Sequence, residues 1–176
     1  MEATTGKLLV RPATIQDAGT LNLLIRELAE FEHLLHETSV TEEDIIRDAF
    51  GENPKFRAII AEYEGLPAGY AIMFDFYSTF RGRAGLFLED LYVRPQYRNK
   101  GIGKAMLAYL AGIASRENYF YMRWQVLDWN KPAIDFYKSL GAVFLDEWKA
   151  VCLIGDPLQA LAGKSDKPVP QKTASS

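Results

Sequence analysis

The segment from Gly85 to Ala105, GLFLEDLYVRPQYRNKGIGKA, constrains the fold of this chain more than any other. Its apolar run predicts a strand, which leads through Arg-Pro into a basic turn with two glycines and then into a helix. The N-terminus of a helix carries partial positive charge and backbone N–H groups without partners. The turn from Gln96 to Gly103 is therefore predicted to bind an anion, and a phosphate group fits such a turn.

Two common phosphate-binding motifs are excluded by the residues of this turn. A nucleotide P-loop requires Gly-x-x-x-x-Gly-Lys-Ser/Thr, but Arg98 stands where its first glycine belongs and Ala105 follows Lys104. A dinucleotide fingerprint requires a third glycine at the position of Met106. The pattern that remains is Arg-x-x-Gly-x-Gly directly after a strand.

Composition limits the class of protein. A chain of 176 residues, 48% hydrophobic and 24% charged, is expected to form one soluble domain. The net charge of −3 disfavours nucleic-acid binding through a basic surface. One cysteine, Cys152, and two histidines, His33 and His36, predict no disulfide and no metal site. The first residues lack the apolar core of a signal peptide and no segment reaches membrane-spanning length, which predicts a cytoplasmic protein without a membrane partner.

Hydrophobic periodicity and turn residues predict an α/β chain in which a mixed sheet of about seven strands carries helices on both faces. The strands are expected at 7–11, 56–62, 68–76, 85–93, 122–128, 142–145 and 149–154, and the helices at 18–33, 41–50, 103–118 and 131–140. Residues 163–176 contain no aromatic residue and are predicted to form a disordered tail, which leaves residues 1–162 as the domain.

A second informative segment, WNKPAIDFYKSLGA at 129–142, matches the pattern Asn-x-x-Ala-x-x-x-Tyr-x-x-x-Gly-Phe, with Ala142 in place of the Phe. Together with the Arg-x-x-Gly-x-Gly turn, it resembles the GCN5-related N-acetyltransferases, which bind acetyl-coenzyme A. Within that superfamily the chain is similar to the diamine acetyltransferases, which include the spermidine/spermine and thialysine enzymes. The matching stretches are LVRPAT at 9–14, IRELAEFE at 25–32, TEEDIIRDAFGENP at 41–54, LEDLYV at 88–93 and YRNKGIGKAML at 97–107.

The phosphate of the turn would then belong to acetyl-CoA. Backbone N–H groups of the turn would hold the pyrophosphate, with added charge from Arg98, Lys100 and Lys104. The resemblance implies that the pantetheine arm pairs with the strand before the turn, at a bulge that separates Leu91 to Val93 from a neighbouring strand. An ordinary solvated turn and an ordinary core strand are the alternatives. The residues expected to contact the coenzyme are Leu91, Tyr92, Val93, Arg98, Asn99, Lys100, Gly101, Ile102, Gly103, Lys104, Asn130, Ala133 and Tyr137.

Two residues are candidates for catalysis. Tyr137 is protonated at neutral pH, because the reference pKa of tyrosine is about 10, and it can protonate a departing thiolate. Glu89 can attract an ammonium group and accept its proton through a water molecule, and strand alternation directs Asp90 to the opposite face. A core tyrosine and a salt-bridged glutamate are the alternatives.

The amine is less well defined than the coenzyme. The resemblance implies substrate contacts at Phe31, Glu32, Glu89 and Glu147, and a homodimer. In polyamine-specific enzymes the loop before the Leu-Glu-Asp strand carries an acid and a tryptophan. This chain has Tyr77 to Arg83 there instead, and its two arginines, Arg81 and Arg83, favour an amino-acid-like amine such as thialysine over spermidine. An acetyltransferase for an antibiotic or a peptide N-terminus, and an acyl-CoA-binding module without catalytic activity, remain as alternatives.

Overall fold

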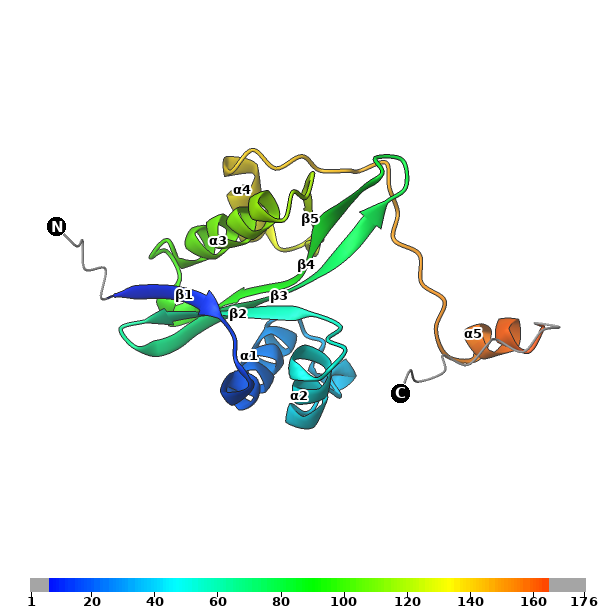
Figure 1. The fold of residues 1–176 in the computed structure, drawn as a ribbon, viewed down its shortest axis with the longest axis horizontal. Coiled ribbons are helices and arrows are strands. Elements are labelled where there is room, and N and C mark those ends of the chain that lie inside the picture. Colours follow the sequence, from blue (N-terminus) through cyan, green and yellow to red (C-terminus); the bar gives the residue numbers. More distant parts are fainter. Residues whose placement is uncertain (1–6, 165–176) are drawn as a thin grey trace. The chain divides into compact units, whose positions relative to one another are not determined.

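The computed structural model describes residues 7–164, and the chain divides into two compact units between Leu127 and Asp128. The first unit contains a five-stranded sheet in the order β1-β2-β3-β4-β5 (Figure 1). Its strands are β1 (Leu8–Pro12), β2 (Arg57–Tyr63), β3 (Leu66–Ser78), β4 (Arg83–Val93) and β5 (Met122–Trp124). Its helices are η1 (Ile15–Asp17), α1 (Ala18–Phe31), η2 (Leu35–Glu37), α2 (Glu42–Phe50), η3 (Pro95–Tyr97) and α3 (Ile102–Arg116).

The sheet is mixed, as expected from the sequence. Strands β1 to β4 pair antiparallel with their neighbours, whereas β5 runs parallel to β4. A tight turn at Glu64 and Gly65, both with positive φ, joins β2 to β3. Strand β5 pairs only with Leu86 to Leu88, so within the described residues the second half of β4 has no strand on that side.

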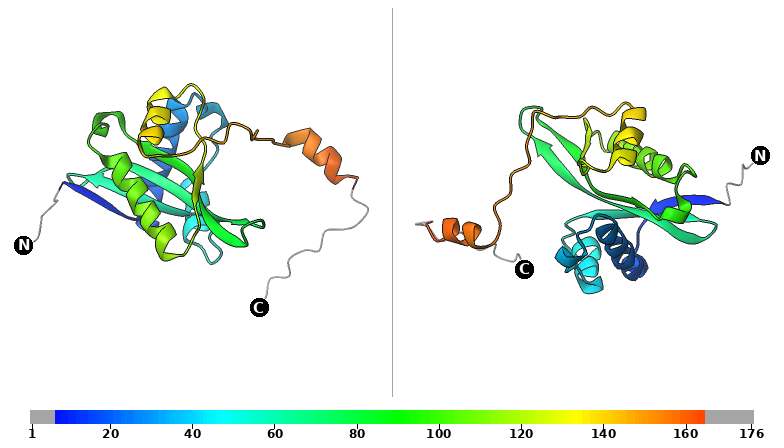
Figure 2. Two further views of the ribbon diagram at one scale, coloured as in Figure 1. Left: turned by 90° about the horizontal axis from the view of Figure 1, so that it is seen from above. Right: turned by 180° about the vertical axis from the view of Figure 1, so that it is seen from behind.

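Helices cover both faces of this sheet. Helices α1 and α2 lie on one face and α3 lies on the other, as the views in Figures 1 and 2 agree. Helix α2 begins with a capping box, in which Thr41 Oγ1 accepts from Asp44 N–H and Asp44 Oδ2 accepts from Thr41 N–H. The core under α1 and α2 contains Leu21, Leu24, Ile45, Ile60, Tyr70 and Tyr92.

The second unit contains α4 (Lys131–Ser139) and α5 (Gly155–Ala162). The strands expected at 142–145 and 149–154 are wrong, because the structure has no strand in either range and leaves Val143 and Val151 83% and 90% exposed. Alternating apolar residues form a strand only where a neighbouring strand accepts their hydrogen bonds. Helix α5 was not expected. Most of the tail predicted at 163–176, residues 165–176, lies outside the described residues.

Candidate active site

The predicted phosphate turn leads directly into α3. Gly101 is the N-cap of α3 with φ of 78°, and Asn99 also has a positive φ of 60°. Gly101 suits this backbone because L side chains are strained there. The first backbone hydrogen bond of the helix runs from Ala105 N–H to Gly101 O over 3.0 Å. The N–H groups of Ile102, Gly103 and Lys104 precede it, so they have no acceptor within the helix, and N–H groups of this kind favour an anion.

Arg94 fixes the start of this turn. Its guanidinium donates to both carboxylate oxygens of Glu27 on α1, with Nη2 to Oε1 at 2.7 Å and Nε to Oε2 at 2.9 Å. Its Nη1 donates to Pro67 O at 2.9 Å. The turn is therefore tied both to α1 and to the start of β3. Sequence reasoning missed this pair, because its members are 67 residues apart and no local spacing indicates it.

Arg98, a predicted coenzyme contact, lies next to Phe31, a predicted substrate contact. Its Nε donates to Val93 O at 3.0 Å, and its guanidinium carbon lies 4.7 Å from the centroid of the Phe31 ring. Phe31 is the last residue of α1. The contact is a cation–π pair that joins the phosphate turn to the end of α1.

Strand β4 contains a bulge at Glu89. Ile72 pairs with Asp90 while the next residue, Met73, pairs with Leu88, so Glu89 is the extra residue. The bulge expected at Leu91 to Val93 therefore lies upstream of them, because those three residues keep a regular register with β3. The Glu89 side chain is exposed, as a contact with a soluble amine requires.

Asp90 is the carboxylate that sequence reasoning overlooked. It is only partly exposed and accepts a hydrogen bond from Tyr70 Oη at 3.0 Å. Burial raises the pKa of Asp90 to about 6, the hydrogen bond from Tyr70 lowers it, and the charges of Glu89 and Glu32 raise it. Burial and the charge of Asp90 also raise the pKa of Tyr70 well above its usual range. A carboxyl group that titrates near neutrality is typical of functional sites.

Three carboxylates, Glu32, Glu89 and Asp90, form what we call the carboxylate cluster. Glu32 caps the C-terminus of α1, is half-buried, and has its pKa raised by that burial. Glu32 and Glu89 are close enough to Asp90 for their charges to raise its pKa. Because like charges repel, a cation bound among them lowers the energy of all three. The cluster is therefore suited to an ammonium group.

The second unit holds the remaining predicted residues. Asn130 Oδ1 caps α4 by accepting from Ala133 N–H at 3.3 Å, and Tyr137 is buried on the same helix. The Tyr137 carbonyl accepts from Ala142 N–H at 3.1 Å. Asn130, Ala133 and Tyr137 are thus brought together on one helix. Glu147 is exposed in a turn after α4.

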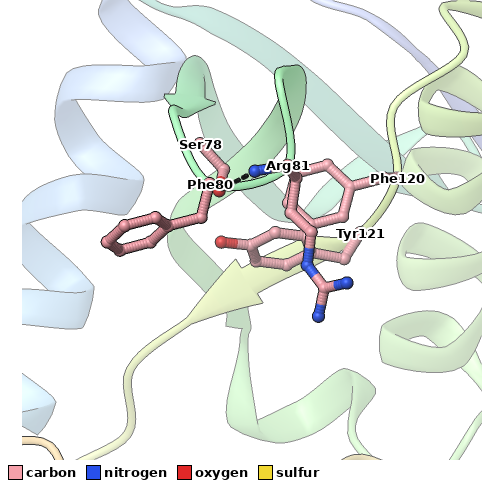
Figure 3. A pocket seen from close by; sticks show the side chains of 5 residues that line it. All are labelled: Ser78, Phe80, Arg81, Phe120 and Tyr121. Atoms are coloured by element: carbon pink, nitrogen blue, oxygen red, sulfur yellow. Dashed lines mark hydrogen bonds between the residues drawn. The ribbon is translucent and has the colours of Figure 1, made fainter.

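A pocket of about 600 Å³ lies at the tip of the β3–β4 hairpin (Figure 3). Its walls are Ser78, Phe80, Arg81, Phe120 and Tyr121. Figure 3 shows the Phe80 ring extending away from the Arg81 guanidinium. The other arginine of the hairpin, Arg83, donates from Nη2 to Asn118 Oδ1 at 2.6 Å. Of the two arginines expected to attract a carboxylate, Arg81 lines the pocket and Arg83 holds the hairpin to the residues after α3.

Solved structures share this mixed sheet, in which the fourth strand leads through a turn into α3. The structure aligns with an aminoglycoside acetyltransferase from an uncultured soil metagenomic sample with a TM-score of 0.69 at 18% identity, covering 86% of this chain and 97% of that one. Residues 22–142 match the acetyltransferase (GNAT) family. The chain belongs to this family and is an N-acetyltransferase.

Two relatives match a larger share of the chain than the family model does. Thialysine N-epsilon-acetyltransferase of Sus scrofa is 40% identical over 167 residues, which cover 89% of this chain and 98% of that protein. L-Ornithine N5-acetyltransferase of Arabidopsis thaliana is 28% identical, and the alignment covers 86% of each chain. The resemblance drawn from the sequence motifs is thus confirmed.

Proposed function

We propose that the enzyme transfers the acetyl group of acetyl-CoA to a primary amine of a small molecule, and that this molecule is a lysine-like amine of the thialysine type. The observation that carries the proposal is the carboxylate cluster, which offers a cation three carboxyl groups, one just after α1 and two on β4. Two relatives, named for thialysine Nε and for L-ornithine N5, support an amino-acid amine.

The first unit offers the groups that acetyl-CoA needs. The open N–H groups at the start of α3, with Lys100 and Lys104, suit the pyrophosphate. Beyond Leu88, the side of β4 that faces away from β3 has no strand beside it in the described part of the chain. This open side suits the amides of the pantetheine arm. Asn130 and Ala133 stay predicted coenzyme contacts. When bound, acetyl-CoA supplies an acetyl thioester.

Residues of the protein would take a proton from the amine and give a proton to the departing sulfur. The amine nitrogen bonds to the acetyl carbonyl carbon while the carbon–sulfur bond breaks. The ammonium group first loses one proton to solvent, and Glu89 takes the second proton of the nitrogen through a water molecule as the new bond forms. The Tyr137 hydroxyl donates a proton to the departing sulfur and regains one from water. The charges of Glu32 and Asp90 hold the ammonium form of the substrate before deprotonation. Because they also raise the pKa of the amine, the rate should increase above neutral pH.

Selectivity among amines is proposed to depend on the Phe31 and Glu147 contacts and on Arg81. Arg81 places positive charge at the hairpin pocket, where it would attract the carboxylate of an amino acid and repel spermidine. Thialysine should therefore be the better substrate.

We also propose that the enzyme is a homodimer. Support comes from the exposed large apolar side chains of residues 143–161, which a second copy of the chain would cover. These residues are Val143, Leu145, Trp148, Val151, Leu153, Ile154, Leu158 and Leu161. Light scattering should give the mass of two chains, and V151D should shift it toward one. A single-chain mass for the unchanged protein would contradict this proposal. A cytoplasmic location stays a prediction.

An amine panel with acetyl-CoA, followed through release of free thiol, tests the proposed reaction. Turnover of thialysine well above that of spermidine supports it. Turnover of an aminoglycoside or a peptide N-terminus alone would show a different amine class. Binding of acetyl-CoA without turnover of any amine would contradict an enzymatic role.

A further inference from the structure

Two lysines and two tyrosines meet beside the phosphate turn. The Tyr63 ring, at the end of β2, has Lys7 Nζ 5.1 Å and Lys100 Nζ 4.7 Å from its centroid. The Tyr97 ring lies 5.7 Å from the Tyr63 ring and 5.9 Å from Lys100 Nζ, centroid distances in both cases. We call these four residues the lysine–tyrosine cluster. All four belong to the first unit.

The lysine–tyrosine cluster extends from the phosphate turn toward the start of β1 and the end of β2. Lys100 and Tyr97 are part of the phosphate turn, whereas Lys7 precedes β1 and Tyr63 ends β2. Lys100 is therefore shared by the turn and the cluster. A ligand whose pyrophosphate lies at the start of α3 can reach Lys7 and Tyr63 only with a further group attached to that pyrophosphate.

The charge of the cluster is mostly uncompensated. Glu64 pairs with Lys7 at 3.3 Å, but both side chains are 62% exposed, so water screens this pair strongly. Within residues 7–164, Lys100 makes no ion pair. Both lysines are exposed, whereas Tyr63, which both contact, is only 8% exposed. Two exposed ammonium groups therefore lie close to one buried aromatic ring.

We propose that the lysine–tyrosine cluster binds the 3′-phosphoadenosine end of coenzyme A, an inference that rests on the proposed use of acetyl-CoA. In the coenzyme, the pyrophosphate is joined to a ribose that carries a 3′-phosphate and adenine. The phosphate monoester is the group between Lys7 and Lys100, and the Tyr97 ring, which is partly exposed, offers a face to the adenine. The cluster thus distinguishes coenzyme A from its 3′-dephospho form.

Calorimetric titration with coenzyme A and with 3′-dephospho-coenzyme A tests this assignment without any amine. The unchanged protein should bind coenzyme A about tenfold more tightly, as one charge-assisted contact to a phosphate contributes. K7Q should remove most of this preference and leave the affinity for the dephospho form unchanged. K100Q should weaken both ligands, and coenzyme A more, because Lys100 also faces the pyrophosphate.

K55Q is the matched control, since Lys55 is exposed just before β2 and outside the cluster. It should bind both ligands as the unchanged protein does, and thermal unfolding of each variant shows that the fold is retained. Equal affinity of the unchanged protein for the two ligands overturns the inference and leaves the proposed function standing. Equal weakening of both ligands by K7Q also overturns it, because the lysine then only supports the fold. Failure to bind coenzyme A at all refutes the proposed function together with the inference.

Discussion

Two members of the carboxylate cluster, Glu89 and Asp90, come only a few residues before the phosphate turn, yet the cluster and the turn are built differently. The turn is local: its N–H groups and the positive φ of Gly101 arise within residues 94–105. The cluster is assembled from α1 and β4, and it depends on the bulge at Glu89. Local sites of this kind are visible in a sequence, whereas a site set by strand register is not.

The predicted residues of helix α4 come from one short segment, as those of the phosphate turn do. A change on this helix has the largest expected effect on activity. Y137F should lower kcat by 10²- to 10³-fold, because it removes the proton donor for the departing thiolate, while the KM for acetyl-CoA changes little. Steady-state kinetics measures both constants. Y109F is the control, since Tyr109 lies on α3 outside the site. An equal loss in kcat and coenzyme affinity would show that Tyr137 is structural.

The cluster predicts a change in stability with pH. The pKa of Asp90 is about 6 in the folded protein and near 4 when unfolded, so between these values the folded state binds more protons. Stability should therefore fall as pH rises from about 4 to 6 and stay level above that. D90N removes this loss, so it should be more stable than the unchanged protein by about 3 kcal/mol at pH 8.

Urea unfolding at pH 4.5 and pH 8 checks this difference. D90N should gain clearly less at pH 4.5 than at pH 8, because only part of the loss from ionising Asp90 has occurred at the lower pH. A gain that is equally large at both pH values would mean that the carboxylate is not the cause.

The turn predicts a smaller effect on coenzyme binding. G101A forces a β-carbon into φ of 78°, which costs about 1–2 kcal/mol, so the KM for acetyl-CoA should rise about tenfold. G65A is a matched control, because Gly65 has the same φ and also has nothing within 4 Å of a built Cβ. Both variants should lose similar stability. If G65A raises the KM as much, the geometry of the turn is not what binds the coenzyme.

The hydrogen bond from Tyr70 gives the finest test of the cluster. It lowers the pKa of Asp90, so Y70F should raise the pH at which amine binding reaches half its maximum by about one pH unit. The pH dependence of the amine KM measures this. Y92F removes a hydroxyl from the same core and should leave that pH in place. An unchanged midpoint in Y70F would separate Asp90 from amine binding.

The sequence was informative wherever function depends on neighbouring residues. The mixed sheet, the turn at Gly101 and the helix after Asn130 were all predicted from local patterns of residues, and the structure contains each of them. Asp90 was missed because alternation assumes a regular strand, and the bulge at Glu89 shifts the register.

Long-range pairs were missed for a related reason. The Arg94–Glu27 pair and the Arg98–Phe31 contact join segments far apart in the chain, so no spacing indicates them. The strands expected at 142–145 and 149–154 failed because alternation alone supplies no hydrogen-bonding neighbour.

Two-substrate kinetics of D90N at pH 8 tests most directly the claim that the carboxylate cluster receives the amine. The KM for thialysine should rise about tenfold, because one charge is lost beside the ammonium group, and the KM for acetyl-CoA should not change. An unchanged amine KM, or an equal rise in both constants, would contradict the account.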